Sequence, residues 1–87
     1  MTKYDKVIKK YGSMTQILQT MEECGELVVV LNHYLRGRAD VKAVMKELVD
    51  VQIMIDQMKE LFDLMDATMF STSYNKRVRE LMEECDD

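Results

Sequence analysis

The chain has 87 residues, of which 47% are hydrophobic, and this length supports one small domain over residues 1–87 rather than two. The net charge of -4 disfavours general binding to nucleic acid or to an anionic membrane surface, and favours a small-molecule or protein partner. The sequence has neither the roughly 20 consecutive apolar residues of a membrane-spanning helix nor a signal-peptide hydrophobic region, so we expect a cytoplasmic protein.

The absence of proline, the presence of only three glycines and a helical apolar periodicity throughout predict an all-α fold. A short first helix follows the spacing of Tyr4, Val7, Ile8 and Tyr11 and is expected to end near Gly12. The second helix is expected to start at Ser13, because Ser13 and Gln16 have the spacing of a capping box. Its apolar residues form a seam that we expect to face the core: Ile17, Met21, Cys24, Val28, Leu31 and Leu35.

Residues 36–39 are predicted to form a turn, in which Gly37 can adopt the left-handed conformation, and Asp40 is the expected N-cap of the third helix. The third helix has a seam of the same kind: Val41, Val44, Leu48, Val51, Ile55, Met58, Phe62 and Met65. A last helix is outlined by apolar residues from Tyr74 to Cys85, with Ser71 or Ser73 as its expected cap. These patterns predict an antiparallel helical hairpin with short flanking helices, whose four-helix-bundle core is completed by assembly into a homodimer or homotetramer.

The two cysteines are expected to be reduced thiols. Cys24 falls on the apolar seam of the second helix, and Cys85 lies near the end of the last helix. Because the sequence has no secretory signal, buried free thiols are favoured over a disulfide bond.

Two pairs of acidic residues have the i, i+3 spacing that puts both carboxylates of a pair on one helix face: Glu23 with Glu26, and Glu47 with Asp50. In an antiparallel hairpin, residues whose numbers have the same sum lie level with each other. Both 23 with 50 and 26 with 47 sum to 73, so the two pairs should face each other. Lys46 is expected to point to another side of its helix. Four facing carboxylates beside the core need a cation, basic partners or protonation, and their oxygen ligands favour magnesium, with manganese as the alternative ion. The alternative interpretation is that they are ordinary surface acids of an acidic helical protein.

The motif that carries these acids resembles a known family. The segments Glu22-Glu23-Cys24-Gly25-Glu26-Leu27 and Glu47-Leu48-Val49-Asp50 are similar to the EExxE and ExxD segments of the MazG-like family of all-α nucleoside triphosphate pyrophosphohydrolases. The resemblance covers roughly residues 13–62. It implies that Glu23, Glu26, Glu47 and Asp50 are the catalytic, magnesium-binding residues, with Glu22 as an extra acid of the motif. It also implies cleavage of a nucleotide between the α and β phosphates, and a dimeric or tetrameric protein.

Basic residues begin the last helix at Lys76, Arg77 and Arg79, in a region where MazG-like proteins often carry a lysine and an arginine that meet the substrate phosphates. The resemblance therefore makes these three residues candidates for phosphate binding. The alternative interpretation is a solvated basic helix face. The single histidine, His33, has no acid or thiol at motif spacing and is interpreted as a surface or interface residue.

Two other functions remain open. Phosphoribosyl-ATP pyrophosphatase shares the helical carboxylate scheme, but its second motif usually continues with a Tyr-His pair, where this chain has Val51-Gln52-Ile53. The non-enzymatic alternative is a helical interaction module, supported by nine methionines that offer an adaptable apolar surface. Magnesium separates the two classes, because an interaction module has no reason to be stabilised by the ion.

Overall fold

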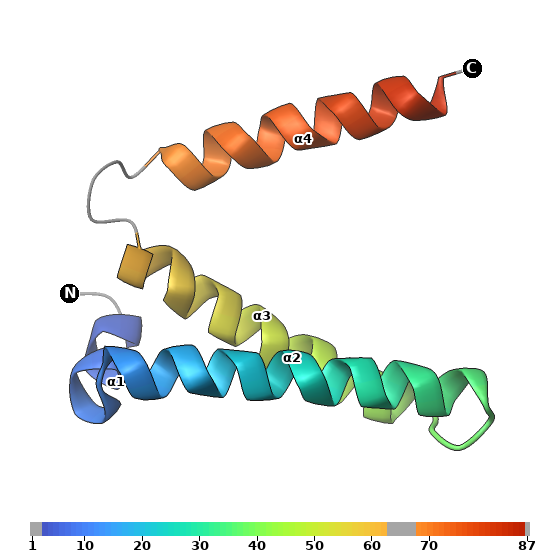
Figure 1. The fold of residues 1–87 in the computed structure, drawn as a ribbon, viewed down its shortest axis with the longest axis horizontal. Coiled ribbons are helices and arrows are strands. Elements are labelled where there is room, and N and C mark those ends of the chain that lie inside the picture. The colour runs from blue at the N-terminus through green and yellow to red at the C-terminus, as the bar shows by residue number, and fades with distance from the viewer. Residues whose placement is uncertain (1–2, 63–67, 87) are drawn as a thin grey trace.

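The computed structural model describes residues 3–62 and 68–86, and every regular element within them is an α-helix (Figure 1). The helices are α1 (Lys3–Tyr11), α2 (Ser13–Leu35), α3 (Val41–Phe62) and α4 (Met69–Cys85). The prediction of an all-α chain is therefore confirmed over these ranges. None of the helices described has both the length and the apolar character that a membrane crossing requires.

The boundary between α1 and α2 is made by Gly12 rather than by a capping box. Gly12 has a φ of 89°, a left-handed conformation that favours glycine, and it occupies the N-cap position of α2 without a side-chain hydrogen bond. The predicted capping box of Ser13 and Gln16 is wrong. Ser13 is already the first helical residue, and the side chain of Gln16 is buried against α3 instead.

The turn between α2 and α3 has the hydrogen bonds of a Schellman motif. Gly37, at a φ of 71°, donates its backbone N–H to the carbonyl of Tyr34 over 3.1 Å, and Arg38 donates to His33 over 2.8 Å. Asp40 then caps α3, since its Oδ1 atom accepts the backbone N–H of Ala43 over 2.9 Å. The predicted roles of Gly37 and Asp40 are confirmed.

Helices α2 and α3 pack along each other, and α1 packs against both of them (Figure 1). Near the start of α2 and the end of α3, Gln16 donates its Nε2–H to Oε1 of Gln57 over 2.7 Å, and both amides are buried. The residue numbers of this pair also sum to 73. Only Val51 and Met54 are buried apolar residues among those described, so the single chain has a very small core.

The apolar seam predicted for α2 does not face α3, and that prediction is wrong for the single chain. Met21, Val28 and Leu35 are 65%, 68% and 83% exposed, and the thiol of Cys24 is exposed and free. The face of α2 that meets α3 lies about a third of a turn away and carries Gln16, which is buried, with the half-buried Glu23, Leu27 and Val30. The seam of α3 divides in the same way: Val51 is buried, whereas Val41 and Phe62 are exposed. Met65, the last residue of that seam, lies outside the described residues.

Helix α4 stands apart from the other three (Figure 1). Its predicted caps are wrong, because the helix begins at Met69 and therefore contains Ser71 and Ser73. One contact with α3 places the Nζ atom of Lys59 4.5 Å from the centre of the Phe70 ring. The apolar side chains of α4 remain largely exposed, and so does the free thiol of Cys85, which was predicted to be buried.

Candidate metal centre

Three carboxylates from two helices converge near the middle of α2. Glu23 and Glu26 lie one turn apart on α2, and Glu47 lies on α3. Each offers an oxygen atom such that all three oxygens lie within 4.8 Å of one another. Two facing helices thus bring together side chains that are more than twenty residues apart in the sequence.

Burial leaves part of this cluster without partners. Glu23 and Glu47 are half-buried, whereas Glu26 is exposed. The Oε2 atoms of Glu23 and Glu47 are buried, and neither has a hydrogen-bond partner among the described residues. The other oxygen of Glu23 accepts a 2.9 Å hydrogen bond from Nε2 of Gln19, one turn earlier on α2. Buried carboxylate oxygens without partners are costly, which is the condition that a bound cation relieves.

The electrostatics of the cluster act most clearly on Glu26. The negative charge of Glu23 raises the pKa of Glu26, and partial desolvation, the charge of Glu47 and hydrogen bonds to both neighbouring carboxylates raise it further. The raised pKa means that the cluster holds a proton more readily than an isolated glutamate does. A divalent cation can replace that proton and neutralise the same charges.

Asp50, the fourth predicted ligand, is outside this group of three. Its Oδ2 atom lies 3.4 Å from Nζ of Lys46, which is also 3.5 Å from Oε1 of Glu47. The prediction that Lys46 points elsewhere is therefore wrong, because its long side chain reaches back along α3 to both acids. The charge of Glu47, followed by the hydrogen bond and charge of Asp50, raises the pKa of Lys46. The lysine is 71% exposed, so it offsets only part of the charge of the cluster.

An open hollow of about 630 Å³ lies beside the cluster. Glu26 and Glu47 line one part of it, and the remainder is formed by α2 residues: Glu22, Gly25, Val29, Val30 and His33. His33 was predicted to be a surface or interface residue; it is exposed and also lines this hollow. Its position could have been found from helical spacing, because His33 lies seven residues, or two turns, after Glu26. The i, i+4 spacing of Gln19 and Glu23 is a similar signal for the hydrogen bond between their side chains.

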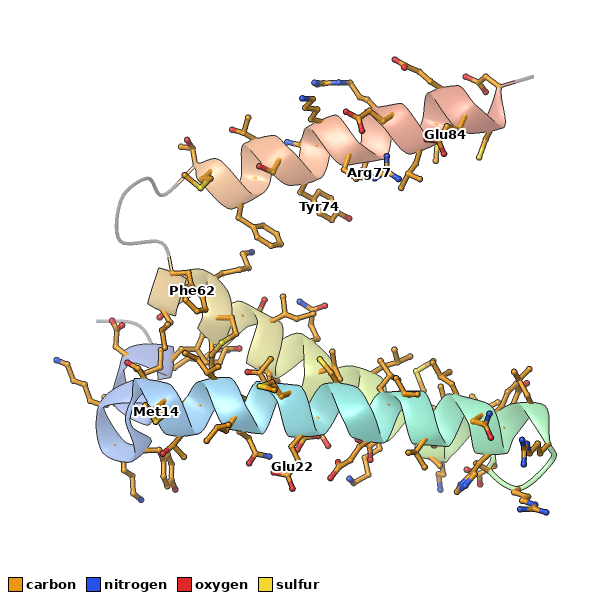
Figure 2. The ribbon with its side chains drawn as sticks, viewed as in Figure 1. Met14, Glu22, Phe62, Tyr74, Arg77 and Glu84 are labelled. Atoms are coloured by element: carbon orange, nitrogen blue, oxygen red, sulfur yellow. The ribbon has the colours of Figure 1, made fainter. Side chains whose placement is uncertain are left out.

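The three basic candidates on α4 are not brought to the carboxylates within the described chain. Arg77 instead forms ion pairs along its own helix, at 3.1 Å to Glu80 and 3.8 Å to Glu84 (Figure 2). Lys76 and Arg79 are exposed and form no ion pair within residues 3–62 and 68–86. No extensive packing joins α4 to the helices that carry the acids.

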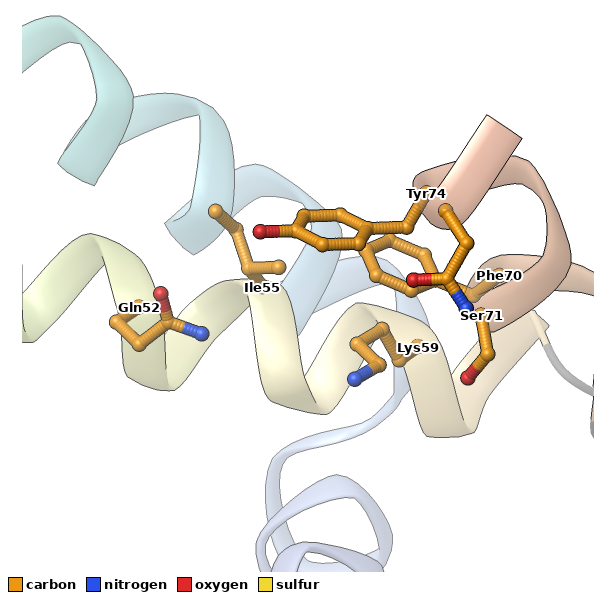
Figure 3. Close-up of a pocket in the computed structure, with 7 residues that line it drawn as sticks. Gln52, Ile55, Lys59, Phe70, Ser71 and Tyr74 are labelled. Carbon is orange, nitrogen blue, oxygen red and sulfur yellow. The ribbon is translucent and has the colours of Figure 1, made fainter. Parts of the chain in front are cut away.

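A second pocket, of about 410 Å³, lies between α3 and α4 (Figure 3). Its walls come from Gln52, Ile55 and Lys59 on α3 and from Phe70, Ser71, Tyr74 and Asn75 on α4. The rings of Phe70 and Tyr74 stack with their centres 6.2 Å apart. None of the three clustered glutamates lines this pocket, so the two features are separate.

The donor set of the cluster consists only of carboxylate oxygens, which suits a hard cation such as magnesium or manganese and does not suit a thiol-seeking metal. The two buried oxygens without partners agree with this chemistry. Comparisons with protein-family models, with curated proteins and with solved structures find no match for this chain. The resemblance to the MazG-like family thus remains a prediction from the two acidic segments.

Proposed function

We propose that this chain is a metal-dependent nucleotide pyrophosphohydrolase, which cleaves a ribo- or deoxynucleoside triphosphate to the monophosphate and pyrophosphate. The observation that carries the proposal is the convergence of Glu23, Glu26 and Glu47 within 4.8 Å, with two buried oxygens that lack partners. The resemblance of the two acidic segments to the MazG-like family supports the choice of reaction.

Glu23, Glu26 and Glu47 would bind magnesium, and Asp50 would join them when Lys46 is displaced. Bound magnesium supplies charge neutralisation for phosphate oxygens and lowers the pKa of a coordinated water. Gln19 keeps the carboxylate of Glu23 in place through their hydrogen bond. A carboxylate oxygen that is not fully committed to the metal would accept the proton of the attacking water. The adjoining hollow has room for part of a nucleotide and presents His33 and two valines to it.

The proposal includes the predicted architecture. Helices α2 and α3 would act as an antiparallel hairpin, and a cytoplasmic homodimer or homotetramer would complete the bundle. The exposed apolar residues on both long helices support association. Lys76, Arg77 and Arg79 would meet substrate phosphates only after α4 takes a position against the acidic cluster, within the chain or across an oligomer.

The Glu47→Gln variant tests the site directly. It keeps the size of the side chain but removes a charged ligand, so magnesium-dependent pyrophosphate release should fall at least about a hundredfold. Without metal, the variant should be as stable as the wild type or more stable, because the substitution removes repulsion with Glu26.

The measurement is pyrophosphate release from a panel of nucleoside triphosphates and phosphoribosyl-ATP, with magnesium or with chelator. Glu83→Gln, an exposed position on α4, is the matched control. Full turnover by Glu47→Gln would refute the site.

A non-enzymatic interaction module is the second candidate, and the exposed apolar residues of α2 and α4 are the specific observation in its favour. The two functions differ in their response to magnesium. A metal centre should raise the midpoint of thermal unfolding with millimolar magnesium, and Glu47→Gln should abolish that rise. Absence of both pyrophosphate release and magnesium stabilisation would leave the interaction module as the better account.

A further inference from the structure

The single chain exposes more surface than a compact protein of its mass. Its accessible surface is 7093 Å², whereas a folded monomer of 10.2 kDa is expected to expose about 5,300 Å². Its radius of gyration is 15.9 Å, against about 12 Å for a compact domain of this length. The excess area, about 1,800 Å², is roughly twice what one partner contributes to a standard protein–protein interface. A substantial part of this surface is therefore available for a partner.

An apolar surface lies on the side of α2 that faces away from α3. We call it the outer stripe, and it consists of Met14, Leu18, Met21, Val28 and Leu35, which are 76%, 58%, 65%, 68% and 83% exposed. Their spacing places them on one helix face, and Figure 2 shows Met14 at the start of it. Gly25 and Asn32 occupy the two remaining positions of this face, so it carries no charged residue.

The outer stripe is self-complementary when a second copy is placed antiparallel to the first. The numbers of Met14 and Leu35 sum to 49, and so do those of Met21 and Val28. Met21 of one copy would then meet Val28 of the second, and Met14 would meet Leu35. The two-fold axis would pass between Cys24 and Gly25. A two-fold interface requires this self-complementarity, because the same patch is used by both subunits.

Gly25 gives an independent reason to place a second helix here. Glycine inside a helix costs about 1 kcal/mol relative to alanine. Among residues 3–62 and 68–86, nothing lies within 4 Å of the position that a Cβ atom at Gly25 would occupy, so packing against this part of the chain does not require the glycine. At the centre of a helix crossing, the missing side chain allows the two backbones to approach closely.

Gly25 also connects the outer stripe to the metal centre. It lines the hollow together with Glu26, Glu47 and Val29. In an antiparallel two-fold pair the same edges of the two helices meet, so the edge that carries Glu22 and Val29 would meet its counterpart from the second copy. The second copy would thereby supply the wall that the open hollow lacks.

We propose that two copies of this chain pair antiparallel through the outer stripe of α2, cross at Gly25, and each close the hollow beside the carboxylate cluster of the other. The use of that hollow for a nucleotide rests on the proposed function, whereas the pairing does not. Both hollows open on the same side of the pair, with Val29 from each copy next to Glu22 of the other.

Sedimentation equilibrium tests the pairing. The wild type should be a dimer, and Val28→Asp should be monomeric at concentrations where the wild type is dimeric, because each dimer would bury two aspartates in an apolar contact. Met82→Asp is the matched control, since Met82 is 56% exposed but lies on α4. Gly25→Ala should retain its helical content and weaken dimerisation about tenfold or more. A monomeric wild type, or a dimer that Met82→Asp abolishes and Val28→Asp does not, would overturn the proposal.

Thiol cross-linking gives a readout that does not depend on how a variant folds. In Cys85→Ser, the remaining Cys24 lies next to the proposed two-fold axis, so a short bis-maleimide should trap a covalent dimer. Cys24→Ser, which keeps Cys85, should not be trapped. Cross-linking through Cys85 alone would place the interface elsewhere. If the pairing is observed and no nucleotide is hydrolysed, the proposed function fails and the pairing stands.

Discussion

At the scale of single residues, the carboxylate cluster combines groups with different surroundings. Glu23 is held by Gln19, Glu47 lies beside Lys46, and Glu26 has neither partner and is the most exposed of the three. The pKa of Glu26 is raised, chiefly by the charge of Glu23.

The raised pKa of Glu26 gives a pH prediction for the metal-free protein. The folded state holds the proton more tightly than the unfolded state, so stability should fall as pH rises from the ordinary value of 4.5 through the raised pKa. Glu26→Gln should lack this part of the decline. The measurement is chemical denaturation in chelator across that pH range. A wild type and a Glu26→Gln variant with the same pH slope would contradict the electrostatic account.

At the scale of helices, the turn at Gly37 is a boundary that backbone geometry defines. Its left-handed φ of 71° disfavours a side chain, and two backbone hydrogen bonds depend on that conformation. Gly37→Ala should destabilise the protein by about 1–2 kcal/mol. Gly37→Asn should cost less, because asparagine tolerates the left-handed region better than alanine. Urea denaturation of both variants measures the difference, and equal losses would show that the conformation is not the cause.

The sequence predicted helix boundaries well where backbone geometry required a particular residue, as at Gly37 and Asp40. It failed where one residue had two roles. Gln16 fits a capping box by spacing, but its amide is buried against Gln57, a contact across 41 residues that local patterns do not reveal. The apolar spacing of α2 predicted a seam that faces the core, yet several residues of that seam are exposed in the single chain. Periodicity identifies an apolar face and does not say which element covers it.

The candidate site was also predicted only in part. The equal sums of residue numbers predicted that Glu26 and Glu47 lie close together, and the i, i+3 spacing predicted that Glu23 joins them; the structure places all three together. Asp50 lies outside the group and pairs with the flexible side chain of Lys46. Side-chain rotamers of a long lysine do not follow from helical spacing alone. The position of α4 could not be predicted either, since its apolar face is compatible with several partners.

At the scale of the whole molecule, stability should depend on protein concentration. A chain in which only Val51 and Met54 are buried apolar residues among those described has little to hold it folded alone. If dimerisation supplies the missing burial, the midpoint of thermal unfolding should rise as the protein is concentrated. Differential scanning calorimetry over a hundredfold range of concentration measures this. The Val28→Asp variant should unfold at a lower temperature that does not change with concentration, and a constant midpoint for the wild type would contradict the prediction.

The hydrogen bond between Gln16 and Gln57 has a consequence for the charged cluster, although neither amide touches a carboxylate. If α3 slid by one turn along α2, Glu47 would leave Glu26 and meet other side chains, and the amides of Gln16 and Gln57 would lose the hydrogen bond that joins them. Other registers of α3 against α2 are therefore disfavoured by two neutral side chains that lie two turns or more from the acids. The choice of which carboxylates meet is thus made outside the site, by residues that no metal or substrate needs to contact.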